Sequence, residues 1–142
     1  MSSQSSDGQV IFFGSFDPLH DGHRNAFVQA KLFGKSLIVI VARDSAILRD
    51  KHHTSSVPEQ ERLMAVAADP SVDTAMLGDA DLTSYAILRT VPFDTLALGY
   101  DQEPSDEEAR RILDENGLHD ARVVRLVSYN PGVYKSSFLR KG

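Results

Sequence analysis

Two histidines, His20 and His23, stand three residues apart in a stretch that reads GSFDPLHDGH over residues 14–23. An apolar run precedes this stretch and a helical pattern follows it, so the sequence predicts a turn from a strand into a helix. The first turn of a helix offers unpaired N–H groups and the positive end of the helix dipole, which favour anions. Two imidazoles there could bind phosphate oxygens and stabilise charge that builds up as a phosphorus–oxygen bond breaks. The stretch therefore indicates a phosphate-handling site.

The other residues of this stretch suit the same interpretation. Gly14 permits a tight turn and a close approach of another molecule to the backbone. A metal site is the competing interpretation, but only Asp17 and Asp21 lie nearby as further ligands, which leaves it weaker. We expect Asp17 to accept hydrogen bonds from loop N–H groups instead. His52, His53 and His119 lack such surroundings and are expected to be ordinary core or surface residues.

The rest of the chain predicts the elements that position this stretch. Expected strands are 10–13, 37–42, 72–77, 95–98 and 121–127, and expected helices are 24–33, 58–69, 82–90, 106–115 and one that begins at residue 136. This alternation is typical of a single doubly wound, Rossmann-like α/β domain with a mainly parallel five-stranded sheet, here over residues 10–142. The Ser-rich residues 1–9 are expected to be a disordered lead-in. The polar segment 43–57 is expected to be an active-site loop near the carboxyl end of the second strand.

Composition excludes several functions. The 142 residues carry a formal net charge of −5, so binding to the backbone of a nucleic acid is disfavoured. The chain has no cysteine, which excludes disulfides, thiolate catalysis and cysteine-ligated zinc. The longest apolar run, 37–42, is too short to cross a membrane. A cytoplasmic protein without nucleic-acid or membrane partners is the expectation.

The stretch 14–23 resembles the signature of the nucleotidyltransferase superfamily that carries the His-x-Gly-His motif. Its members include cytidylyltransferases and the adenylyltransferases of phosphopantetheine and nicotinamide mononucleotide. The sequences VARD at 41–44 and PEQERL at 58–63 are similar to the glycerol-3-phosphate cytidylyltransferase-like group. LGYDQ at 98–102 looks most like the archaeal FAD synthase (FMN adenylyltransferase) branch. The resemblance therefore covers nearly the whole chain.

The resemblance implies roles for individual residues. His20 and His23 would bind the triphosphate and stabilise the transition state, and Lys51 would reach the transferred phosphate, with Arg49 and Arg62 as alternatives to Lys51. The expected nucleotide-binding residues are Gly14, Ser15, Phe16, Gly22, Gly99, Tyr100, Asp101, Gln102, Ser136 and Ser137. Mg²⁺ would be bound through the phosphates and not by protein ligands.

The resemblance also implies a reaction. A nucleoside monophosphate would move from ATP, or from CTP, to a phosphorylated small molecule, and pyrophosphate would leave. The first choice is adenylyl transfer to FMN, because of residues 98–102. Cytidylyl transfer to glycerol-3-phosphate or a related alcohol phosphate is the second, and adenylyl transfer to phosphopantetheine is the third. A nucleotide-binding sensor without turnover is the non-enzymatic alternative. A homodimer is expected.

Overall fold

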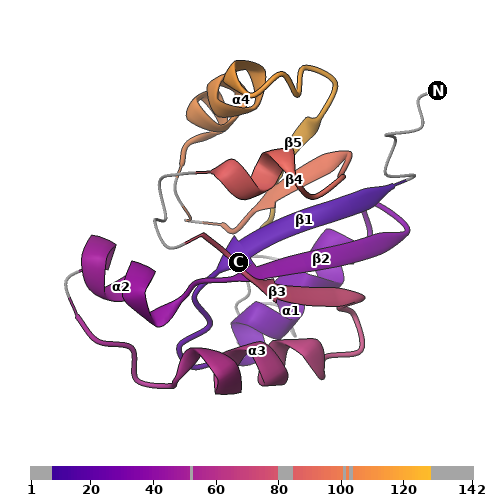
Figure 1. Ribbon diagram of the computed structural model, residues 1–142. Helices are drawn as coiled ribbons and strands as arrows, with labels where there is room; N and C mark the ends of the chain where they lie inside the picture. The colour runs from indigo at the N-terminus through magenta and orange to yellow at the C-terminus, as the bar shows by residue number, and fades with distance from the viewer. Residues whose placement is uncertain (1–7, 52, 80–84, 101, 103, 129–142) are drawn as a thin grey trace.

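Five parallel strands form the centre of the protein in a computed structural model, which describes residues 8–51, 53–79, 85–100, 102 and 104–128 (Figure 1). The strands are β1 (Gln9–Gly14), β2 (Ser36–Val41), β3 (Thr74–Leu77), β4 (Thr95–Leu98) and β5 (Arg122–Arg125). They lie in the order β3-β2-β1-β4-β5, and every neighbouring pair is parallel. This confirms the predicted doubly wound α/β fold.

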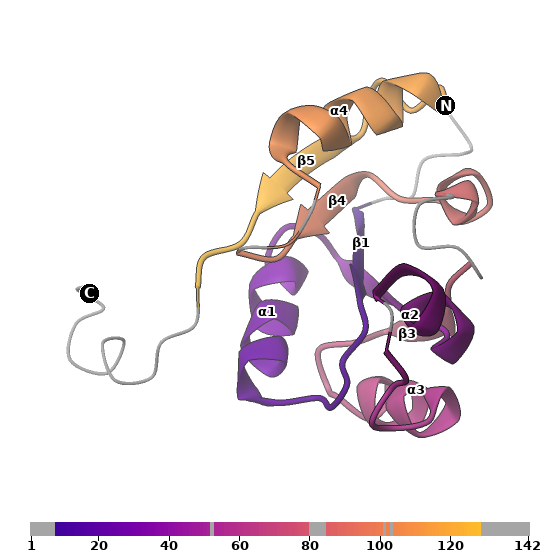
Figure 2. The same ribbon diagram turned by 90° about the vertical axis from the view of Figure 1, so that its left-hand side faces the viewer.

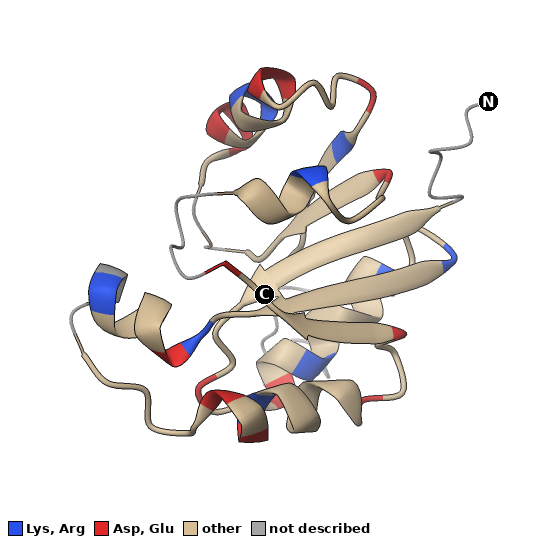
Figure 3. Cartoon of the chain, viewed as in Figure 1, with Lys and Arg blue, Asp and Glu red and all other residues tan. Residues whose placement is uncertain are grey.

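Alternating side chains of the strands supply two apolar layers, one on each face of the sheet. Val10 and Phe12 of β1 pack on one face, together with Phe27 of the first helix. Ile11 packs on the other face, together with Leu113 of the last described helix. Because β1, β2 and β3 carry no charged residue, both faces can be covered by helices, and Figure 3 shows the charges on helices and at strand ends.

The helices divide between these two faces. They are α1 (Asp21–Lys31), α2 (Asp44–Lys51), α3 (Glu59–Ala67), the 3-10 helix η1 (Ala86–Arg89) and α4 (Asp106–Glu115). α1 and α3 contribute to the first layer, whereas η1 and α4 contribute to the second. Figure 2 shows α1 and α3 on the opposite side of the sheet from α4.

β1 and β4 are neighbours in the sheet although they are far apart in the sequence, where β2 and β3 lie between them. From β1 the chain runs outward through β2 to β3, then crosses to β4 and runs outward to β5 on the other side. The order of the strands therefore reverses between β1 and β4. In open α/β sheets, ligands bind in the crevice that such a reversal leaves at the carboxyl ends of the strands.

The structure corrects four details of the expected elements. Residues 44–51 form the helix α2 and not a loop, because Ala46 and Ile47 are both buried there and give the segment an apolar side. η1 has only four residues, and part of the helix expected at 82–90 lies outside the described residues. β5 is shorter than expected at both ends. β1 begins at Gln9, inside the expected lead-in.

The preceding residue, Gly8, is also held by the sheet. Its carbonyl accepts from the N–H groups of Lys35 and Ser36, 2.6 and 3.3 Å away.

No helix among the described residues is long and apolar enough to cross a membrane.

Candidate active site

The two histidines begin α1 and contact each other. Their rings stack with centroids 3.7 Å apart and an angle of 19° between the planes. The His20 Nδ1 atom accepts from the Gly22 N–H at 3.1 Å, and the His23 Nδ1 atom accepts from the His20 N–H at 3.2 Å. This reciprocal pair is a capping box in which histidines replace the usual Ser/Thr and Glu.

The capping box determines which ring nitrogen carries the proton. Because the Nδ1 atoms of both His20 and His23 accept a hydrogen bond, the proton of each neutral ring resides on Nε2. Each Nε2–H group is then a donor on the ring edge opposite the backbone. The stacked rings thus place two donors at the positive end of a helix dipole.

His23 is held in its neutral form. Partial burial, then the nearby His20 and Arg24, lower the pKa of His23 from its ordinary value of 6.5 to about 4. The Phe16 ring packs edge-on against the His23 imidazole with centroids 5.0 Å apart, which contributes to that burial. Near pH 7, His23 is therefore a neutral donor and not a cation.

Gly14 makes room for Phe16. The Phe16 backbone has a φ of 54°, which L-residues rarely adopt, and its ring is buried against Phe12 and Phe27. A Cβ atom on Gly14 would lie 2.5 Å from the Phe16 Cζ atom. The space above Gly14, where we expected another molecule to approach, is therefore filled by this ring.

Asp17 behaves as predicted from the sequence. Its carboxylate accepts from the N–H groups of Ser56 and Val57 at 2.8 and 2.7 Å. The bond between Asp17 and Pro18 is cis. These contacts join the histidine stretch to the segment before α3 and confirm the structural interpretation of Asp17.

Arg62 of α3 is buried, with only 1% of its surface exposed. Its Nη1 atom donates to the carbonyls of Ser15 and Ala42 at 2.8 and 2.6 Å, and its Nε atom donates to the Val57 carbonyl at 2.7 Å. Its Nη2 atom contacts the Asp44 carboxylate at 2.6 Å. Arg62 therefore fixes the loop backbone, and its guanidinium is bonded to these carbonyls and to Asp44.

The start of α2 is fixed to the start of α3. The Asp44 N–H donates to Glu59 at 2.7 Å and the Glu59 N–H donates to Asp44 at 3.2 Å. A hydrogen bond from Ser55 is the main cause that lowers the pKa of Asp44. Of the two other basic candidates, Arg49 is exposed on α2, whereas Lys51 ends α2 and its side chain lies outside the described residues.

The second half of the site is the loop after β4. The Gln102 side chain bridges the diverging strand ends: its Oε1 atom accepts from the Gly99 N–H at 2.7 Å, and its Nε2 atom donates to the Phe13 carbonyl at 2.7 Å. Tyr100 is 64% exposed. Asp101 lies outside the described residues. The loop is thereby attached to the end of β1, directly before the histidine stretch.

The structure thus links Gly99 and Gln102 to the end of β1, directly before residues 14–23, at the reversal between β1 and β4. Ser136 and Ser137 lie outside the described residues. Sequence reasoning gave no role to Arg125, the last residue of β5, which binds the loop after β4. No local signal in the sequence identifies it, because its carbonyl partners lie in the loop after β4.

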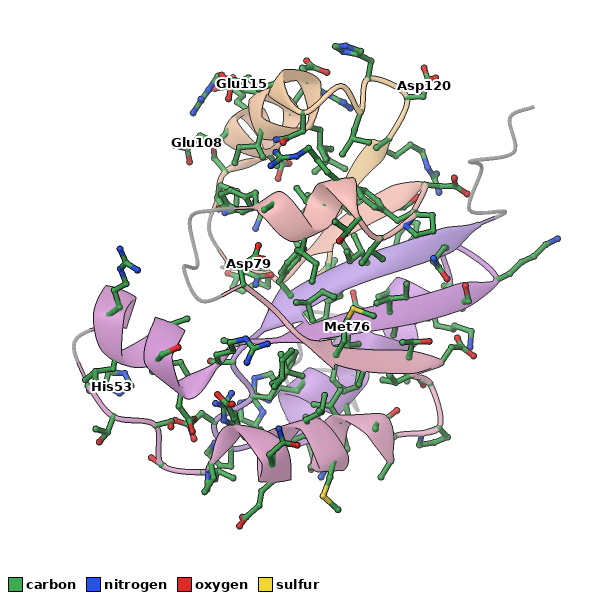
Figure 4. All side chains as sticks on the ribbon, viewed as in Figure 1. His53, Met76, Asp79, Glu108, Glu115 and Asp120 are labelled. Carbon is green, nitrogen blue, oxygen red and sulfur yellow. The ribbon has the colours of Figure 1, made fainter. Side chains whose placement is uncertain are left out.

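Other candidate groups lie away from this place. His53 lies on the segment that follows α2, on the outside of the molecule (Figure 4), and its Nδ1 atom is 3.0 Å from the Thr54 carbonyl. Glu108 and Glu115 point away from the sheet on α4, as expected for a solvated helix face (Figure 4). Among the described residues, no group of three or more His, Asp or Glu side chains could hold a metal ion.

Comparisons with known proteins agree with this geometry. A model of the cytidylyltransferase-like family matches residues 11–142. A FAD synthase of Methanocella paludicola is 40% identical over 130 residues, which are 91% of this chain and 90% of that protein. A FAD synthase of Thermoplasma acidophilum is 35% identical over 133 residues, which are 94% and 92% of the two chains.

A solved structure shares the fold. The lipopolysaccharide core biosynthesis protein of Thermoplasma volcanium superposes with a TM-score of 0.78 at 31% identity. The match covers 86% of this chain and 98% of that one.

Proposed function

The chain belongs to the cytidylyltransferase-like family of nucleotidyltransferases, and we propose that its own reaction is the transfer of an adenylyl group from ATP to FMN. The single observation that carries the proposal is the pair of Nε2–H donors at the start of α1, beside the reversal of the strand order. The choice of FMN rests on the FAD synthases to which the chain is similar over about nine tenths of its length.

The reaction needs positioning and charge stabilisation more than it needs acid–base groups. A phosphate oxygen of FMN attacks the α-phosphorus of ATP in line, the bond to the β-phosphate oxygen breaks, and pyrophosphate leaves. The attacking phosphate is already an anion, so no protein group has to remove a proton. Donors aimed at the oxygens that gain charge then lower the barrier.

The two halves of the site suit the two ends of ATP. We assign the triphosphate to the start of α1, where His20 and His23 donate from Nε2 and the helix dipole adds a positive potential. We assign the adenosine to the loop from Gly99 to Gln102. Lys51, Ser136 and Ser137 stay proposed phosphate ligands.

We propose that Mg²⁺ enters the site on the triphosphate. The Asp17 carboxylate already accepts two backbone N–H groups, and the described residues offer no other cluster of ligands. Bound to phosphate oxygens, the ion would neutralise charge on the pyrophosphate that leaves.

A matrix of substrates tests the proposal. Purified protein with Mg²⁺ receives ATP or CTP, each with FMN, glycerol-3-phosphate or phosphopantetheine, and pyrophosphate release is measured. We expect release with ATP and FMN and an accompanying gain of FAD. Release with CTP and an alcohol phosphate would replace the proposal by cytidylyl transfer. Tight binding of the triphosphate, without release of pyrophosphate in any mixture, would favour a nucleotide-binding sensor that does not turn over.

Two further expectations stay predictions. Light scattering checks the homodimer. Fractionation of the source cells checks the cytoplasmic location.

A further inference from the structure

We propose that Arg125 is a positioning residue for nucleotide binding, because it sets the shape of the loop that follows β4. The inference rests on the proposed function, which assigns this loop to the adenosine of ATP. It gives a role to a cation that stands at the carboxyl end of β5 but is directed to backbone carbonyls instead of a phosphate.

The Arg125 guanidinium binds the loop at several points. Its Nη1 atom donates to the carbonyls of Gly99 and Gln102 at 2.8 and 2.6 Å. Its Nη2 atom donates to the Pro104 carbonyl at 2.9 Å. Nη2 and Nε also donate to the Asp106 carboxylate, at 2.7 and 3.0 Å. Three carbonyls spread over six residues therefore converge on one side chain.

The contact with Asp106 balances the charge and orients the guanidinium. Asp106 is the first residue of α4, whose start is fixed by a capping box between Ser105 and Glu108. The capped start of α4 thus carries the carboxylate that contacts Arg125, and Arg125 contacts the loop. The bonds from Arg125 to the three carbonyls are partly buried, whereas the two to Asp106 are exposed to water.

Gln102 secures the same loop from the opposite side. Its amide joins the Gly99 N–H to the Phe13 carbonyl of β1. Arg125, by contrast, joins the loop to β5. Gly99, Gln102 and Pro104 are therefore held between the two strands that flank β4.

Preorganisation of this kind acts on affinity. A loop that is already ordered loses little conformational freedom when the ligand binds, whereas a loose loop has to be ordered first. A planar guanidinium can donate to several carbonyls in fixed directions, but a lysine ammonium cannot reproduce that fork. The loss of Arg125 should thus weaken ATP binding and leave the chemical step, which we assign to the start of α1, largely intact.

Steady-state kinetics of Arg125→Met and Arg125→Lys test the proposal. For Arg125→Met we expect the KM for ATP to rise about 10- to 100-fold, as for a misplaced binding group. The kcat should change by less than about threefold, and the KM for FMN should hold. Arg125→Lys should recover part of the loss.

Arg122→Met is the matched control. Arg122 begins the same strand, and its guanidinium donates to the Thr95 hydroxyl at 3.0 and 3.2 Å and to the Phe33 carbonyl at 3.2 Å. It makes these contacts at the other end of the sheet. This variant should lose stability with no change in the KM for ATP.

Hydrogen exchange of the loop amides gives a readout that does not need turnover. We expect the peptide that spans residues 99–104 to exchange faster in Arg125→Met and at the wild-type rate in Arg122→Met. Unchanged exchange together with an unchanged KM for ATP would overturn the proposal. Absence of adenylyl transfer in the wild-type protein would overturn the proposed function, and the exchange rates would still decide whether Arg125 holds the loop.

Discussion

The two halves of the site are built in different ways. At the start of α1, the Nδ1 atoms of His20 and His23 accept from backbone N–H groups, and their Nε2 atoms stay available as donors. In the loop after β4, the Gln102 side chain joins the loop to β1, and the Arg125 guanidinium donates to the carbonyls of the loop. The histidines hold the backbone with one ring nitrogen and leave the other for the ligand that we propose, whereas Gln102 and Arg125 are bonded to the backbone alone or to Asp106.

Each half also has its own buried or half-buried arginine. Arg62 binds the carbonyls of Ser15, Ala42 and Val57 beneath the histidine stretch. Arg125 binds carbonyls beneath the second loop. Arg62 and Arg125 therefore hold the backbone of the two halves, and the donors that we propose for the ligand are the imidazoles of His20 and His23.

The two arginines should differ in their effect on stability, and here we expect the largest loss. Arg62→Met removes a guanidinium that is 1% exposed, so three carbonyls lose this donor and Asp44 loses its ion pair, which should cost about 3–5 kcal/mol of unfolding free energy. Urea unfolding measures it. The matched Arg125→Met variant should lose less, because that side chain is 25% exposed. An equal loss in both variants would contradict the distinction.

The start of α1, which carries His20 and His23, should control the chemical step. Replacement of His20 by Ala removes one donor to the reacting phosphates and should lower kcat about 100- to 1000-fold, the effect of a lost oxyanion donor. The matched control is His119→Ala, since His119 is exposed and contacts only Asp114 and Arg110 in the hydrogen bonds described. A rise in the KM for ATP at unchanged kcat would show that His20 acts in binding alone.

The two glycines that begin the two loops give a smaller contrast. A Cβ on Gly14 would lie 2.5 Å from the Phe16 ring, so Gly14→Ala should cost about 1–3 kcal/mol. A Cβ on Gly99 would meet Gln102 at 3.4 Å, so Gly99→Ala should be nearly neutral for stability. Thermal unfolding of both variants checks the difference. A similar loss at both positions would mean that the Phe16 ring can move away.

The smallest effect concerns pH. The pKa of His23 is lowered to about 4 in the folded protein from an ordinary value of 6.5. Between these two pH values the unfolded chain binds a proton at His23 and the folded protein does not. With respect to His23, the free energy of unfolding is therefore highest above pH 6.5, and it declines as the pH falls toward 4. Because the imidazole is half-exposed, the effect should be modest.

His23→Asn isolates that effect. The Asn Oδ1 atom can replace Nδ1 as the acceptor for the His20 N–H, and it does not titrate in this range. Its unfolding free energy should therefore fall less between pH 6.5 and pH 4 than that of the wild-type protein. His119→Asn serves as the control. Equal pH dependence of the wild type and His23→Asn would show that burial of His23 does not matter.

The sequence was informative where local chemistry dominates and silent where distant contacts decide. Five apolar runs predicted the sheet, and residues 14–23 predicted a helix start because both signals are local. The helix α2 was missed, since its buried side consists of little more than Ala46 and Ile47. The contacts of Arg62 with backbone carbonyls could not be foreseen, because its partners come from residues as far as 47 positions away.

The same limit applies to the loop after β4. Residues 98–102 drew attention through their resemblance to relatives, but nothing in them indicated that Gln102 bridges β1 and β4. That contact depends on the strand order, in which β4 lies beside β1. Arg125 in turn becomes visible only when β5 is placed next to β4.

The central claim is that an adenylyl group, and not a phosphoryl group, moves from ATP to FMN at the start of α1. ATP labelled at the α-phosphate, and in a parallel reaction at the γ-phosphate, tests it most directly in the presence of FMN and Mg²⁺. The account predicts that the α-label appears in FAD and that the γ-label appears in pyrophosphate, one pyrophosphate for each FAD. Transfer of the γ-label to the acceptor, or a product without the α-label, would contradict it.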